Sequence, residues 1–213
     1  MTTPDQFTQG VMVHKLPKAP LVDRIEYLAT LARGRRVIHV GFVDTGCQTM
    51  QAAAGYEAYA ADCRDPEALA TLDIAPAQLV IAGEVIEHLD DPGAFLAGLQ
   101  TLVAPGGQLV VTTPNAYGLF NVLASLARRE INHPDHVMMF TWRTLTNLAS
   151  RHGWAPDETR VYVPSVKDLS GSGLTARLLG LAASFAVVLE RVLARLGRGY
   201  AADGMIIAFR STR

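Results

Sequence analysis

The sequence has few cysteines, almost no net charge and no apolar leader, and each absence excludes a class of protein. Two cysteines, Cys47 and Cys63, are too few for a disulfide scaffold and suggest a reducing compartment. A net charge of −1 gives no electrostatic argument for nucleic-acid binding, so we expect no nucleic-acid partner. The polar opening MTTPDQFTQG lacks the apolar core of a secretion signal. These features together predict a cytoplasmic protein.

Several catalytic motifs are also missing. No G-x-S-x-G marks a serine hydrolase, and no GK[ST] follows a glycine loop as in a P-loop enzyme. The glycine loop after the first expected strand lacks G-x-G-x-x-G, which argues against a nicotinamide-dependent oxidoreductase. His133 and His136 lie close together, but no third ligand follows at matching spacing, so we expect no metal site.

What the sequence does contain is an alternation of strand-like and helix-like segments. A hydrophobic fraction of 49% predicts one globular domain over residues 21–213, after a polar extension over residues 1–20. Strands are expected at Val37–Val40, Tyr56–Ala61, Leu79–Ala82, Gln108–Thr113, Val161–Val163 and Met205–Phe209. Helices are expected at Leu21–Arg33, Pro66–Leu72, Asp91–Leu102, Leu119–Arg128, Thr141–Arg151 and Leu174–Leu196. This order predicts an α/β fold with a doubly wound, mostly parallel sheet and helices on both faces.

The expected helix at Leu174–Leu196, before the last strand, is unusually apolar. Its apolar residues recur at helical spacing, which favours a packed crossover helix. The run Leu178–Leu189 is too short to span a bilayer, and charged residues follow it at once. A homodimer surface and a membrane-surface contact stay open as alternatives.

One block of sequence is specific. GEVIEHLDDPGAFLAGLQTLVAPGGQLVVTTPN, from Gly83 to Asn115, resembles class I S-adenosylmethionine-dependent methyltransferases, especially the small-molecule branch that includes ubiquinone-biosynthesis-type enzymes. HPDHVMMFTWRTLTNLASRHGW, from His133 to Trp154, is similar to the segment before that family's last hairpin. The resemblance implies a Rossmann-like fold, S-adenosylmethionine as cofactor, and in-line methyl transfer to a small-molecule or sugar-type hydroxyl.

The resemblance also implies which residues contact the cofactor. These residues follow the expected strands, at the carboxyl ends where ligands bind in such sheets. They are Gly41, Phe42, Asp44, Gly46, Asp62, Cys63, Gly83 and Glu84. The glycines allow close backbone approach, and Asp44 is expected to accept a hydrogen bond from the amino group of the cofactor. For Asp44 and Asp62, an ordinary turn-capping role remains the alternative.

Four further residues are expected on the acceptor side. His88 and His136 are the candidate general bases, because imidazole titrates in the physiological range. For each, a structural loop histidine is the alternative. Asn115 and Tyr117, after Pro114, are candidates for binding the substrate or fixing the loop.

The sequence departs from the family after Gly46. Only about ten residues separate Gly46 from the strand expected at Tyr56, which leaves no room for a second strand ending in an acid that would hold the ribose. Either a segment is missing, with an abrupt join near Gln51–Ala52, or the fold is shortened and its cofactor site damaged. The second alternative would favour a non-catalytic binding or scaffold protein on the same fold.

Overall fold

A six-stranded sheet forms the centre of the molecule, with strand order β2-β1-β3-β4-β6-β5. The computed structural model describes residues 15–41, 48, 52, 58–61, 69, 72–126, 128–163 and 174–213. The strands are β1 (Val37–Val40), β2 (Ala58–Ala61), β3 (Ala77–Gly83), β4 (Val103–Pro114), β5 (Trp154–Tyr162) and β6 (Gly204–Ser211). The helices are α1 (Arg24–Ala32), α4 (Pro92–Gly98), α5 (Leu119–Leu126), α6 (Trp142–Arg151) and α7 (Leu174–Arg195), with short 3₁₀ turns at η2 (Ile86–His88), η3 (Leu99–Thr101) and η5 (Gly199–Ala201).

Most of the sheet is parallel, as the alternation of elements predicts. Strand β1 pairs in parallel with both β2 and β3, and β3 pairs in parallel with β4. Strand β6 runs antiparallel to both β4 and β5. The carboxyl ends of β1, β3 and β4 therefore lie at one edge of the sheet, where ligands bind in open α/β folds.

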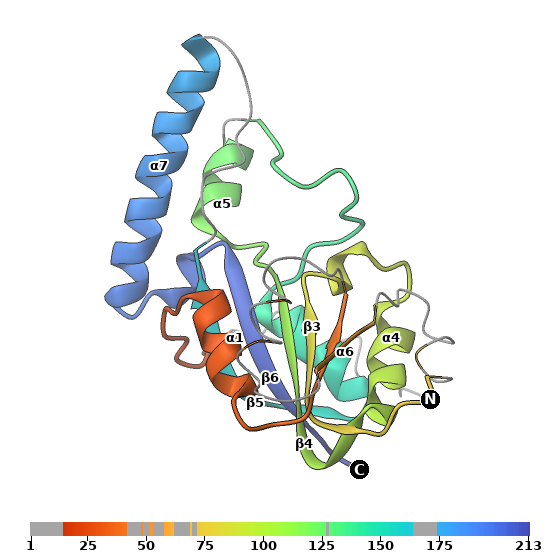
Figure 1. The fold of residues 1–213 in the computed structure, drawn as a ribbon. Coiled ribbons are helices and arrows are strands. Elements are labelled where there is room, and N and C mark those ends of the chain that lie inside the picture. The colour runs from red at the N-terminus through yellow and green to blue at the C-terminus, as the bar shows by residue number, and fades with distance from the viewer. Residues whose placement is uncertain are drawn as a thin grey trace.

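Helices cover both faces of the sheet (Figure 1). Alternate residues of β3 point to opposite faces, as the pleat requires. Val80 and Ala82 join the larger core with residues of α4 and α6. Leu79 and Ile81 join the smaller core with residues of α1. This two-sided burial confirms the expected doubly wound architecture and explains why β3 is an almost continuous apolar run.

Side-chain caps fix where three helices begin. Asp23 accepts a hydrogen bond from the Glu26 N–H at 3.0 Å, and Asp91 accepts one from the Ala94 N–H at 2.9 Å. Thr141 and Thr144 form a reciprocal capping box at the start of α6. Helix α1 therefore begins at Arg24, three residues after the predicted start at Leu21.

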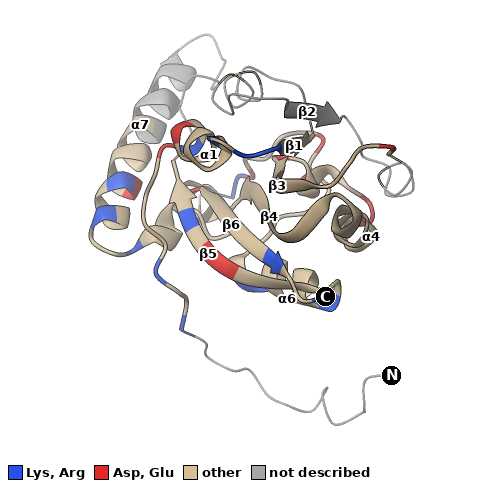
Figure 2. Cartoon of the chain, turned by 60° about the horizontal axis from the view of Figure 1, so that its bottom comes forward, with Lys and Arg blue, Asp and Glu red and all other residues tan. Residues whose placement is uncertain are grey.

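Strands β3, β4, β5 and β6 are all longer than predicted, and the extension is greatest for β4 and β5. Strand β5 begins at Trp154 instead of Val161, because its exposed residues Pro156 and Asp157 hide the strand pattern in the sequence. Strand β4 spans the predicted turn at 105–107, and its pairing with β3 shifts register there. Figure 2 shows basic and acidic residues interspersed along β5, where Arg160 pairs with Glu158.

Helix α7 forms where predicted, but the described part of its apolar stripe is exposed and not packed as expected. Phe185, Val188 and Val192 are 68%, 58% and 43% exposed, while Ala186 and Glu190 are buried. In the part of α7 whose side chains are described, the buried face consists of Ala186, Glu190 and Ala194. No described helix is long and apolar enough to cross a membrane.

The second strand of the sheet corrects one expectation. A four-residue strand, β2, lies beside β1, at the position where the sequence suggested that a strand was absent. Its last residue, Ala61, is level with Val40 of β1. The expected strand at Tyr56–Ala61 is thus confirmed over Ala58–Ala61, and its first two residues lie outside the described residues. The expected helix at Pro66–Leu72 also falls largely outside them.

Candidate active site

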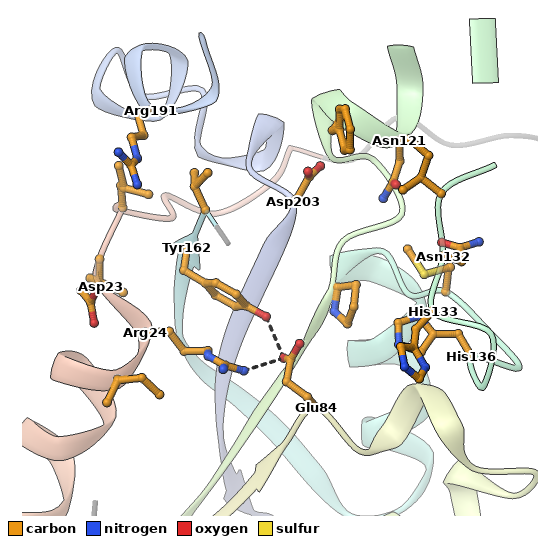
Figure 3. A pocket seen from close by; sticks show the side chains of 18 of the residues that line it. Asp23, Arg24, Glu84, Asn121, Asn132, His133, His136, Tyr162, Arg191 and Asp203 are labelled. Carbon is orange, nitrogen blue, oxygen red and sulfur yellow. Dashed lines mark hydrogen bonds and ion pairs between the residues drawn. The ribbon is translucent and has the colours of Figure 1, made fainter. Parts of the chain in front are cut away.

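A cavity of about 980 Å³ opens at the carboxyl ends of β3 and β4 (Figure 3). Glu84 and Pro114, next to those strand ends, contribute to its floor. Its described walls come from the start of α1, the loop 131–139, Tyr162 of β5 and the end of α7. The volume lies at the upper end of the range typical for small-molecule sites, which is roughly 300–1,000 Å³.

Three side chains hold the carboxylate of Glu84 at the cavity. Tyr162 and Thr112 each donate a hydroxyl hydrogen bond to Glu84 Oε1 at 2.7 Å, and Arg24 Nη1 lies 3.5 Å from the same oxygen. The backbone of Glu84 has φ of +52°, a strained value for a residue with a side chain. Strain that persists at the end of a central strand is typical of a functional position.

Tyr162 is kept as a hydrogen-bond donor. Burial raises the pKa of Tyr162 well above its usual value, and the negative charge of Glu84 raises it further. The hydroxyl therefore stays protonated at any physiological pH and keeps its bond to Glu84. Arg24 also lies 5.3 Å from the centre of the Tyr162 ring, so one cation contacts both members of the pair.

Glu87 connects the turn η2 to the loop opposite. Its buried carboxylate accepts a hydrogen bond from Thr113 Oγ1 at 2.9 Å. Its backbone carbonyl accepts N–H bonds from Val137 at 3.0 Å and Met138 at 3.3 Å. Burial, and then the nearby charge of Glu84, raise the pKa of Glu87 to about 8. The loop is thus tied to the segment that carries His88.

Three histidines meet at one side of the cavity. The ring centres of His88 and His136 lie 4.6 Å apart, and His133 completes the group at 5.7 and 5.5 Å from them. His88 Nδ1 lies 3.2 Å from the Asp135 carbonyl oxygen. Burial lowers the pKa of His136, and the neighbouring imidazoles of His88 and His133 lower it further. Two candidate bases from distant parts of the sequence are therefore neighbours.

Gly41 and Gly83 meet where β1 and β3 end. Gly41 has φ of +132°, which side-chain-bearing residues rarely adopt. A Cβ on Gly41 would lie 3.2 Å from the Gly83 carbonyl oxygen, and one on Gly83 would lie 3.2 Å from His39 Nε2. Both positions thus leave only backbone at the strand ends, which fits a cofactor that approaches the main chain closely. Five predicted cofactor residues lie outside the described residues: Phe42, Asp44, Gly46, Asp62 and Cys63.

Asn115 is buried and its polar atoms are fully engaged by the chain. Its Nδ2 donates to the carbonyl oxygens of Tyr200 and Ala202, both at 2.9 Å, and its Oδ1 accepts the Tyr117 N–H at 3.1 Å. Asn115 therefore fixes the turn after β4 against the turn before β6. Tyr117 is 65% exposed, and neither residue is among those that line the cavity.

Sequence reasoning missed several cavity residues, among them Arg24, Tyr162 and Asp203. Asp203 precedes β6 and neighbours the fully buried Glu190 of α7. Burial raises the pKa of Glu190 to about 8, with a further contribution from Asp203. Wide separation in the sequence hid these residues, although Glu190, directly after the apolar run Leu178–Leu189, was a visible signal.

The chain matches a methyltransferase domain family over residues 12–159. It is 33% identical over 92 residues to a ubiquinone biosynthesis O-methyltransferase of Caulobacter sp. (strain K31). That alignment covers 41% of this chain and 32% of the relative, so the chain matches about a third of the relative's length.

Solved structures share the fold at low sequence identity. A SAM-dependent methyltransferase from Archaeoglobus fulgidus superposes with a TM-score of 0.54 at 15% identity, covering 87% of this chain and 93% of that one. A Burkholderia thailandensis 1,6-didemethyltoxoflavin-N1-methyltransferase, solved with S-adenosylhomocysteine, gives 0.50 at 12% identity, covering 89% and 78%. These likenesses show the α/β Rossmann-like fold.

Proposed function

Since the chain belongs to the family of S-adenosylmethionine-dependent methyltransferases, we propose that it methylates a hydroxyl of a small-molecule or sugar-type acceptor. The observation that carries this proposal is the cavity at the carboxyl ends of β3 and β4, which has Glu84 on its floor and histidines at one side. Its size suits a small acceptor beside a cofactor. The curated relative is an O-methyltransferase, which supports the choice of an oxygen acceptor.

S-adenosylmethionine supplies an activated methyl group on a sulfonium, so the protein's task is positioning and exclusion of water. We assign to Gly41 and Gly83 the positions where the cofactor comes close to the main chain. We assign to Glu84 a polar contact with the cofactor. Glu84 suits that role because three neighbours already fix its carboxylate, so little side-chain conformational entropy is lost when the cofactor binds. The remaining cofactor contacts are proposed for Phe42, Asp44, Gly46, Asp62 and Cys63, as the family resemblance implies.

The acceptor side is proposed to be the wall that carries the histidines. His133 and His136 line the cavity, and His88 lies against His136. We assign to His88 and His136 the task of acting on the acceptor's hydroxyl proton, which an oxygen nucleophile must lose. Tyr117, exposed at the turn after β4, remains a proposed outer contact for the acceptor, and Asn115 positions that turn.

Calorimetric titration with S-adenosylmethionine and S-adenosylhomocysteine tests the proposal directly. We expect saturable binding of both. Absence of binding at millimolar ligand would contradict it and would favour a non-catalytic binding or scaffold role for this chain. Turnover is then assayed with a panel of phenolic, catecholic and sugar hydroxyl compounds, with amines as the comparison set.

A pair of glycine variants shows whether binding occurs at the proposed place. Gly41→Ala puts a Cβ 3.2 Å from the Gly83 carbonyl oxygen, where β1 and β3 end. Gly34→Ala is the matched control, because Gly34 also has a positive φ of +67° but has open space around its Cβ position. Each replacement should cost about 1–3 kcal/mol of stability through backbone strain. Only Gly41→Ala should weaken cofactor binding, and equal affinity in both variants would contradict the assignment.

A further inference from the structure

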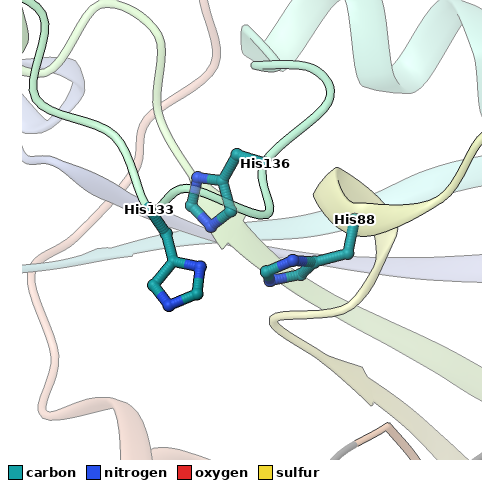
Figure 4. Close-up of side chains that lie close together, drawn as sticks. All are labelled: His88, His133 and His136. Atoms are coloured by element: carbon teal, nitrogen blue, oxygen red, sulfur yellow. The ribbon is translucent and has the colours of Figure 1, made fainter.

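Three imidazoles from two distant segments converge at the cavity (Figure 4). His88 comes from η2, and His133 and His136 come from the loop before α6. One nitrogen of each ring lies within 4.8 Å of a nitrogen of the other two. A set of imidazole nitrogens from separate segments that face one another is the arrangement that a bound metal ion needs.

The surrounding contacts hold the two segments in register. The Glu87 carbonyl oxygen accepts N–H bonds from Val137 and Met138, directly beside the histidines on both segments. The buried Nδ1 of His136 has no hydrogen-bond partner among the described residues. A buried imidazole nitrogen left without a partner costs free energy unless something else binds it.

We propose that His88, His133 and His136 bind one divalent transition-metal ion, with zinc as the reference case. Neutral imidazole is a preferred ligand for zinc, copper, nickel and cobalt, whereas magnesium and calcium select oxygen ligands. Zinc–nitrogen bonds of roughly 2.0–2.1 Å require ligand nitrogens roughly 3.4 Å apart. The ligand nitrogens lie within 4.8 Å of one another, so binding an ion requires the side chains to rotate toward a common point.

Three protein ligands leave a coordination position open, which is the pattern of catalytic rather than structural zinc sites. His133 and His136 line the cavity, so water or an acceptor oxygen can reach the ion. This step rests on the proposed function and deepens it. An ion at this place would lower the pKa of a bound acceptor hydroxyl, whose proton would pass to solvent water. His88 and His136 would then hold the metal in place of acting as general bases.

Metal binding is measured without turnover, on protein that is free of a polyhistidine tag and stripped with a chelator. Zinc is titrated against a chromophoric competitor, and cobalt is added separately for its visible spectrum. We expect one ion per chain. His133→Ala and His136→Ala should each weaken affinity by at least roughly 10-fold, since even residues that only orient a ligand change affinity by roughly 10- to 100-fold.

His152→Ala is the matched control, because His152 lies at the end of α6 and outside the group. It should bind zinc as the wild type does. Circular dichroism and urea unfolding check that the variants fold, and His133→Gln replaces His133→Ala if the alanine variant does not. Three results would each overturn the proposal. They are no zinc binding by the wild type, unchanged zinc affinity in folded His133 and His136 variants, and a thiolate charge-transfer band with cobalt.

Cofactor calorimetry on the same metal-free protein separates this inference from the proposed function. Zinc binding that depends on His133 and His136, without any S-adenosylmethionine binding, would support the metal site while contradicting the methyltransferase activity. Cofactor binding without zinc binding would support the methyltransferase proposal and contradict the metal site.

Discussion

Replacing Glu190 with glutamine should stabilise the protein increasingly as the pH rises from about 6 to 8. Glu190 is fully buried on α7, where its Oε1 accepts the Phe120 N–H at 3.3 Å. Burial, and then the neighbouring Asp203 carboxylate, raise its pKa from 4.5 to about 8. Burial raises the pKa of Asp203 in the same direction. The folded chain therefore keeps a proton that the unfolded chain releases.

The sign and size of this stability change follow from the difference in proton binding between the folded and unfolded chain. Between the unfolded and folded pKa values the folded state binds more protons, so stability falls as pH rises, by at most about 1.4 kcal/mol per pH unit. Below about pH 4.5 both states are protonated and the penalty disappears. Over two units the largest effect is thus roughly 2–3 kcal/mol. Glutamine has nearly the same shape, cannot ionise, and can donate an N–H to Asp203.

Urea unfolding at several pH values between about 6 and 8 measures the effect. The quantity compared is the stability of Glu190→Gln minus that of the wild type, which removes the similar slope contributed by Glu87. Glu130→Gln, at an exposed loop position, should show no pH-dependent difference. A constant difference between Glu190→Gln and wild type across this range would refute the assignment of a raised pKa.

Three further predictions concern packing and the cavity. Trp154→Ala should cost about 3–5 kcal/mol in urea unfolding, since the fully buried ring also donates Nε1–H to the Leu96 carbonyl oxygen at 2.8 Å; a loss below about 1 kcal/mol would contradict that burial. Tyr162→Phe should lose about 1.5–3 kcal/mol and weaken cofactor binding in calorimetry, because Glu84 loses its charge-assisted bond; unchanged stability would contradict that bond's role. Asp91→Ala should cost about 1 kcal/mol by thermal or urea unfolding through loss of the α4 cap, and an unchanged midpoint would show that the cap contributes nothing.

Local sequence determined most of the elements. Strand β1 forms as predicted, because three of its four residues are apolar and all four are buried between neighbouring strands and the covering helices. Helices α6 and α7 begin within a residue of the predicted positions. For α6, the reason is that Thr141 caps its first turn through contacts that span only three residues. The specific block Gly83–Asn115 likewise gave the family, which the match over residues 12–159 confirms.

The candidate site could be predicted only in part from the sequence. His88, Glu84 and Gly41 were marked because they follow strands, and strand ends meet at one edge of a parallel sheet. Arg24 and Tyr162 carry no such mark, since they reach Glu84 only after α1 and β5 are placed around it. The exposed polar residues at the start of β5 also hid that strand's length.

The sequence alone determined three features: the spacing of buried residues along helices and strands, the helix-capping residues, and the residues that follow each strand. These features depend on neighbours within a few positions. Only the tertiary structure decided which remote residues meet. It brought His88 against His133 and His136, and it buried Ala186 and Glu190 of α7 while Phe185 stays exposed. Such pairings depend on strand order and on the path of loops, which no local pattern encodes.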